Sequence, residues 1–143
     1  MIQGDRGIDK DFLGHHSLYH RCKLEDLAGD RMNPTRIRCD NASVNWSKYS
    51  KPWDVIFDYP GGGIVRFVVR DLPSELPTEP PQGAKLRSFS PVHDPMPDNY
   101  AHSEIGTFTE GTRVPNPNLS KTVRKEFQNI MSNRGLILLR PSV

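Results

Sequence analysis

The residues best suited to chemistry lie in one short segment, between positions 93 and 102 of the 143-residue chain. The segment reads HDPMPDNYAH and carries two histidines, two aspartates, an asparagine and a tyrosine. Histidine can accept or donate a proton near neutral pH, and a neighbouring carboxylate or amide can orient its ring. The segment therefore predicts a polar site in which His93 or His102 acts as acid or base and Asp94 or Asn99 orients it.

Other uses of the same segment are open. Two prolines separated by one residue restrict the backbone, so we expect a rigid turn. Aspartates can bond backbone N–H groups and histidines can bond loop carbonyls, which would make the polar residues structural. A metal held by His93, Asp94 and His102 is a further alternative, but their spacing matches no standard zinc or iron signature. We therefore predict no metal, and leave a structural turn and a binding or catalytic site as the alternatives.

A second set of candidate residues lies on the first predicted strand, residues 17–22, and shortly after it. Strand alternation places Tyr19 and Arg21 on one face and His20 on the other. An arginine on a strand can clamp a carboxylate or phosphate, or it can pair with an acid on the neighbouring strand. The segment 41–50 adds hydroxyls, amides and aromatic rings before a predicted helix, where they could bind an anion or cap the helix.

The elements that must position these residues indicate an α+β fold. Alternating or β-branched apolar runs predict strands at 17–22, 35–39, 64–70, 85–92, 102–108 and 136–139. Helices are expected at 50–59 and from 119 to 134, the second because its apolar residues recur with helical spacing. We expect a single compact, loop-rich domain over residues 17–143, with a mostly antiparallel sheet of about five or six strands and two main helices. Residues 1–16 should form a loosely held N-terminal arm.

Composition excludes several classes of protein. The chain is 35% apolar with 13 Pro and 11 Gly, which suits an ordered but loop-rich domain. It has no P-loop, GxGxxG or GxSxG motif. Cys22 and Cys39 lack the spacing of a disulfide framework or a zinc site, which indicates reduced thiols. No apolar run suggests a signal peptide or a membrane span, so we expect a soluble, cytoplasmic protein.

Charge is unevenly distributed although the formal net charge is only +2. Residues 71–112 hold two Lys/Arg against seven Asp/Glu, whereas residues 113–143 hold six against one. The acidic block contains the 93–102 segment and would repel a phosphate backbone. Lys121, Arg124 and Lys125 of the second predicted helix form either a solvated face or a nucleic-acid patch.

Two blocks of the chain resemble a group of small uncharacterised bacterial proteins. The specific block is DPMPDNYAH at 94–102, which follows the pattern DPxPxNxAH. The other combines LYHR at 18–21, SVNWSKY at 43–49 and GIVRF at 63–67. This resemblance implies a recurrent domain and no particular activity.

A second resemblance concerns the aromatic-His-Arg run on the first strand, followed by Ser and Tyr before a helix. This arrangement is similar to that of ADP-ribosyltransferase-like toxins, which grip NAD. The resemblance implies that His20 or Arg21 holds NAD and that Ser43 supports the cofactor. It also implies that Glu104 or Glu110 is the acidic catalytic residue.

No complete catalytic set is present in the sequence, so we expect a small bacterial binding or accessory protein that acts with a partner protein. A toxin or defence operon is its candidate setting. This hypothesis needs no cofactor. The first alternative is an NAD-consuming, ADP-ribosyltransferase-like toxin, and the second is a nucleic-acid-binding protein that uses Lys121, Arg124 and Lys125.

Overall fold

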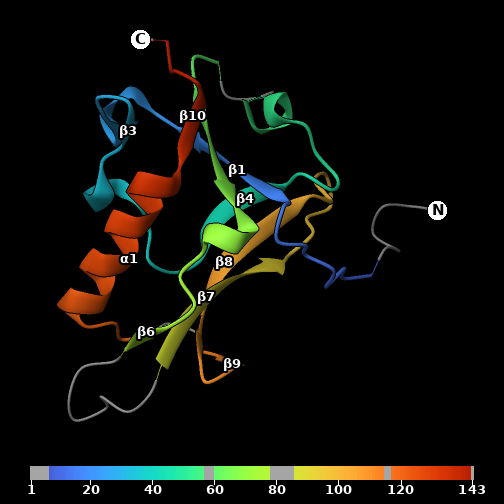
Figure 1. Ribbon diagram of the computed structural model, residues 1–143. Coiled ribbons are helices and arrows are strands. Elements are labelled where there is room, and N and C mark those ends of the chain that lie inside the picture. Colours follow the sequence, from blue (N-terminus) through green and yellow to red (C-terminus); the bar gives the residue numbers. More distant parts are fainter. Residues whose placement is uncertain (1–6, 57–59, 78–85, 115–116, 143) are drawn as a thin grey trace.

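A central antiparallel sheet organises the computed structural model, which describes residues 7–56, 60–77, 86–114 and 117–142. The strands of this eight-stranded sheet lie in the order β10-β5-β1-β4-β8-β7-β6, with β9 paired to β8 (Figure 1). They are β1 (Ser17–Cys22), β4 (Ala42–Trp46), β5 (Gly63–Val68), β6 (Leu76–Pro77), β7 (Leu86–His93), β8 (His102–Thr109), β9 (Thr112–Arg113) and β10 (Leu136–Leu139). A separate ladder pairs β2 (Leu27–Ala28) with β3 (Arg31–Met32).

A single α-helix in the described part of the chain, α1 (Lys121–Arg134), packs along one side of the sheet (Figure 1). The Ser120 hydroxyl caps it by accepting from the backbone N–H of Val123. Val123, Phe127 and Met131 are buried at helical spacing and join the core of the sheet. The rings of Phe127 and Phe89 lie 4.1 Å apart, which joins α1 to β7.

The expected fold class is wrong in its proportions. The described residues form an eight-stranded sheet with one α-helix, instead of five or six strands with two main helices. The expected first helix is a short 3₁₀ helix, η4 (Pro52–Ile56), and residues 57–59 lie outside the described part. None of its residues is buried and Trp53 is 59% exposed, so no apolar face stabilises a longer helix.

Local capping explains a second difference. The predicted strand at 35–39 is replaced by the 3₁₀ helix η3 (Pro34–Arg36) and extended chain. The side chain of Asn33 accepts from the backbone N–H of Thr35, and Pro34 supplies a preset φ at the first helical position. The other short helices are η2 (Leu24–Asp26) and η5 (Val69–Asp71).

Several predicted elements are confirmed. β1 has the expected bounds, and β5, β7, β8, α1 and β10 match their predicted segments within a few residues. β10 lies at an edge of the sheet, where Leu136 is 49% exposed although its segment reads LILL. The described residues include no helix with the length and apolar character to cross a membrane.

The described part of the predicted N-terminal arm, residues 7–16, packs against the end of β4. The ring of Phe12 stacks on that of Trp46 at 3.7 Å. Trp46 Nε1–H donates to His16 Nδ1 at 3.0 Å. Backbone bonds from Val69 to His16 and from Arg70 to Gly14 connect the same stretch to the end of β5.

Candidate functional site

Polar side chains gather on the face of the sheet turned away from α1. Leu18, Val44 and Ile105 belong to the core that α1 covers, so the residues that alternate with them point to the opposite face. On that face β1 pairs with β4 so that Tyr19 lies opposite Asn45, and β4 pairs with β8 so that Asn45 lies opposite His102. One row across three strands therefore carries a phenol, an amide and an imidazole.

A second row of side chains on the same face lies two residues further along β4 and β8. Ser43 on β4 is opposite Glu104 on β8. Here β1 is joined to β4 through a side chain, because His20 Nδ1–H donates to the Ser43 carbonyl at 2.9 Å. His20 thus has a structural contact between two strands, and burial lowers its pKa.

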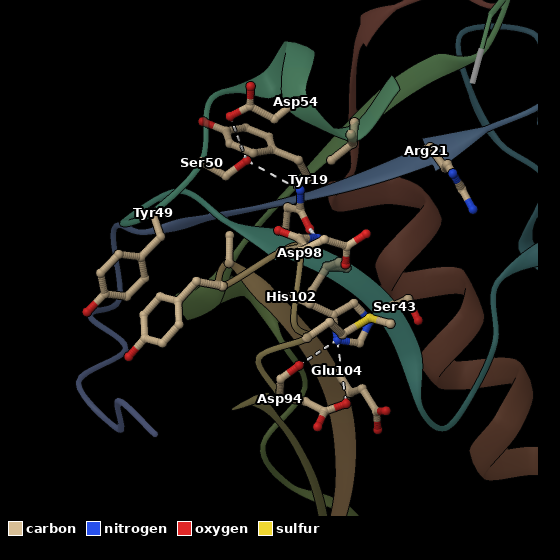
Figure 2. Close-up of a pocket in the computed structure, with 17 residues that line it drawn as sticks. Tyr19, Arg21, Ser43, Tyr49, Ser50, Asp54, Asp94, Asp98, His102 and Glu104 are labelled. Atoms are coloured by element: carbon tan, nitrogen blue, oxygen red, sulfur yellow. Dashed lines mark hydrogen bonds and ion pairs between the residues drawn. The ribbon is translucent and has the colours of Figure 1, made fainter. Parts of the chain in front are cut away.

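These rows form the floor of an open cleft of about 1280 Å³. The segments 49–55 and 94–101 form its walls. Figure 2 shows the side chains from these segments and from β1, β4 and β8 that line it, with Tyr49 and Arg21 toward opposite sides of the view. Six predicted site residues line it: Arg21, Ser43, Asp94, Asn99, His102 and Glu104.

His102 is oriented by Asp94. Its Nδ1 lies 2.8 Å from the Asp94 carbonyl oxygen and 3.5 Å from the Asp94 carboxylate (Figure 2). A carbonyl can only accept, so Nδ1 carries the proton and Nε2 is the nitrogen that can exchange a proton with a ligand. The geometry suits hydrogen-bond recognition or acid–base chemistry.

A chain of side-chain hydrogen bonds fixes one end of the cleft. Asn99 Nδ2 donates to Asn45 Oδ1 at 2.8 Å, and Asn45 Nδ2 donates to Ser50 Oγ at 3.3 Å. The Ser50 hydroxyl lies 3.2 Å from the Asp54 carboxylate. Asn45 is only 7% exposed, so these bonds satisfy a buried amide and hold both walls to the floor.

Glu104 is held by an ion pair. Arg113 on β9 donates from Nη2 to the Glu104 carboxylate at 3.1 Å and to Asn41 Oδ1 at 3.0 Å. The guanidinium of Arg113 packs over Gly106, which has no side chain to obstruct it; a Cβ at that position would lie 3.1 Å from Arg113 Nε. The carboxylate of Glu104 therefore enters the cleft already partly neutralised.

His93 lies outside the cleft, although the sequence places it in the same segment as His102. It pairs with Ser103 on the core side of β7 and β8, and it is 3% exposed. Its Nδ1 accepts from the backbone N–H of Asp9 at 2.9 Å, so Nε2–H donates to the Tyr100 carbonyl at 2.6 Å. Both ring nitrogens are engaged, which makes His93 a structural residue.

The remaining candidates are distributed over other parts of the fold. Glu110 lies in the turn between β8 and β9 with a φ of 50°. Lys121, Arg124 and Lys125 are exposed on α1, on the opposite side of the sheet from the cleft. The structure therefore separates these four residues from the cleft.

Sequence reasoning gave no individual role to several residues of the cleft, although all but Asp54 lie in segments that it singled out. They are Tyr19, Asn45, Tyr49, Ser50, Asp54, Asp98 and Tyr100. A usable signal was the alternation of β4, because Ser43 and Asn45 interrupt its apolar residues at every second position. The pairing of β4 with β8 could not be deduced from that signal.

The cleft is predominantly acidic. The charged side chains lining it are the carboxylates of Asp54, Asp94, Asp98 and Glu104 and the guanidinium of Arg21. Figure 2 shows Arg21 apart from the pair formed by Asp94 and His102. Across the described ranges, no group of three His, Cys, Asp or Glu side chains is arranged to hold a metal ion.

Comparison with known proteins adds no family to this description. No protein-family model, curated protein or solved structure matches the chain.

Proposed function

We propose that the protein is a binding or accessory module whose cleft takes a basic segment of a partner protein. The observation that carries the proposal is the charge of the cleft, which is lined by four carboxylates, one of them (Glu104) paired with Arg113, and by one guanidinium. Carboxylates favour ammonium and guanidinium groups, and their mutual proximity penalises an anionic ligand. The partner segment is therefore rich in Lys or Arg.

The size and walls of the cleft support a peptide as the ligand. Its volume of about 1280 Å³ exceeds the roughly 300–1,000 Å³ typical of sites for small molecules. Tyr19, Tyr49 and Tyr100 contribute aromatic rings to the lining, and such rings attract ammonium and guanidinium groups through cation–π contacts. The oriented His102 ring adds a fixed hydrogen-bonding group for the peptide backbone, and the buried Asn45 amide holds the walls that surround the peptide.

The proposal includes the cellular setting. We place the protein in the bacterial cytoplasm, in a toxin or defence operon, where a small accessory protein acts with the product of a neighbouring gene. The free thiols of Cys22 and Cys39 suit a reducing compartment.

A titration with charged peptides tests the proposal. Hexalysine is the probe and hexaglutamate the control, and binding is followed by amide NMR shifts of residues 94–104. We expect shifts with hexalysine that weaken at higher salt. Asp94→Asn and Asp98→Asn should weaken binding, whereas Glu126→Gln, an exposed acid on α1, should leave it unchanged. Equal binding of both peptides, or shifts centred on α1, would contradict the proposal.

An NAD-consuming transferase is the second candidate, and one observation favours it. Arg21, Ser43 and Glu104, the residues that the resemblance assigns to NAD and catalysis, line the same cleft. Release of nicotinamide from NAD by the purified protein tests it. Activity should disappear in Glu104→Gln and persist in Glu110→Gln, and intact NAD after prolonged incubation would exclude this candidate.

A further inference from the structure

Two tyrosines of the cleft wall are bonded to the chain near its N-terminus. The hydroxyl of Tyr49 bonds the Asp9 carboxylate, and the hydroxyl of Tyr100 donates to the Gly7 carbonyl at 2.6 Å. The two rings meet edge to face with centroids 4.8 Å apart. Since Tyr49 follows β4 and Tyr100 precedes β8, residues 7–9 bridge the two walls of the cleft.

The buried imidazole of His93 also connects Asp9 to Tyr100, on the core side of the sheet. Asp9 donates its backbone N–H to His93, and His93 donates to the carbonyl of Tyr100. The rings of His93 and Tyr100 pack edge to face at 4.7 Å. Removal of residues 7–9 would therefore leave the Tyr49 and Tyr100 hydroxyls and the buried Nδ1 of His93 without these partners.

The bonds of residues 7–9 to the cleft depend on the ionised carboxylate of Asp9. Lys48 Nζ lies 2.6 Å from the Asp9 carboxylate, which also accepts from the backbone N–H of Asp11 at 2.8 Å. The bond from Lys48, followed by the bond from Tyr49, holds the pKa of Asp9 well below its usual range. Asp9 consequently carries its negative charge throughout the neutral range.

We propose that residues 7–9 form a strap that positions Tyr49 and Tyr100, one in each wall and together called the tyrosine wall below, and that Asp9 is a positioning residue for ligand binding in the cleft. The link to ligand binding rests on the proposed function, whereas the position of the tyrosine wall can be measured without any ligand. When the strap is in place, the tyrosine wall is preorganised and the ligand does not have to order it. When the strap is released, part of the binding free energy must order the two tyrosines.

The position of the tyrosine wall is tested in the free protein. Fluorotyrosine ¹⁹F NMR reports the two rings, and the ¹⁵N shift of His93 Nδ1 reports the backbone bond from Asp9. We expect Asp9→Asn to move both tyrosine signals and the His93 signal at temperatures well below unfolding. Asp11→Asn removes the same charge two positions away and should move none of them. Unchanged signals in a folded Asp9→Asn protein would overturn the strap.

Affinity for hexalysine tests the second half of the proposal. Asp9→Asn should weaken binding roughly fivefold relative to Asp11→Asn, through loss of preorganisation. Tyr49→Phe keeps the ring and every charge but loses the bond to Asp9, and it should weaken binding in the same direction. Equal affinity in all these variants would overturn the role in binding. Absence of hexalysine binding to the unmodified protein would refute the proposed function alone, because the NMR signals test the strap separately.

Discussion

Asn99 Nδ2 donates to Asn45 Oδ1 at 2.8 Å, so a loop residue and a strand residue 54 positions apart share a hydrogen bond at the floor of the cleft. Asn45 in turn donates a hydrogen bond from Nδ2 to the hydroxyl of Ser50 in the other wall. The separation between the two walls is thus set by one amide that is almost fully buried. Rigid polar floors of this kind favour recognition because little side-chain entropy is lost on binding.

Truncation of that amide should be costly. We expect Asn45→Ala to lower the free energy of unfolding by about 1–3 kcal/mol, because the Asn99 donor loses its partner in a buried site. The double variant with Asn99→Ala should cost less than the sum of the two single variants. Urea denaturation of all four proteins measures this coupling, and strict additivity would show that the two amides do not interact.

The two histidines of the 93–102 segment should occupy opposite tautomers. His93 accepts at Nδ1 and therefore carries its proton on Nε2, whereas His102 donates from Nδ1 to the Asp94 carbonyl. Long-range ¹H–¹⁵N NMR distinguishes the two tautomers. The same tautomer in both rings would be incompatible with these contacts.

Gly106 should resist substitution. A Cβ there would lie 3.1 Å from Arg113 Nε and 3.3 Å from Val92 Cγ2, so Gly106→Ala should push the guanidinium away from Glu104. We expect a loss of about 1–3 kcal/mol in the free energy of unfolding. Gly7→Ala is the control, since nothing lies within 4 Å of its added Cβ. Equal melting temperatures for the two variants would contradict this packing.

Stability should fall on the acidic side of neutrality. Burial lowers the pKa of both His16 and His20 below the ordinary value of 6.5, with neighbouring His15 as a further cause for His16. The unfolded chain therefore binds more protons than the folded protein at acidic pH. The contribution is fully present above about pH 6.5 and is lost progressively as pH falls below it.

Urea denaturation at several pH values between about 7.5 and 5 measures this dependence. His16 Nδ1 accepts from both Trp46 Nε1 and the backbone N–H of Leu13, so a protonated ring would face two donors. A glutamine can still accept through its amide oxygen but does not titrate in this range. His16→Gln should therefore reduce the pH slope, and an unchanged slope would assign the dependence to other groups.

Local patterns in the sequence predicted β1, β5, β7, β8, β10 and the long helix, because those patterns mark which residues are buried, but they did not predict β4. β1 and α1 illustrate this, since alternation and helical spacing each mark one apolar face. The expected helix at 50–59 failed because a cap and a proline indicate where a helix can begin and say nothing about what it packs against. η4 has no buried residue to extend it.

The residues of the cleft could likewise be predicted from the sequence only in part. The chemistry of Asp94, Asn99 and His102 was visible in one segment of sequence. Their meeting with Tyr19 and Asn45 depends on the strand order β1-β4-β8, which no local pattern encodes. The sequence could not separate His93 from His102, because two histidines in one polar loop look equivalent until the strand register assigns them to different faces.

The position of the cleft on three central strands has a practical consequence for the search for its ligand. β1, β4 and β8 have neighbours on both sides within the sheet, so the floor is lost only when the whole sheet unfolds. A ligand of the cleft consequently adds its binding energy to global stability, about 2.7 kcal/mol at a concentration one hundred times its Kd. Thermal-shift screening of candidate partner peptides can therefore reveal the ligand without an activity assay.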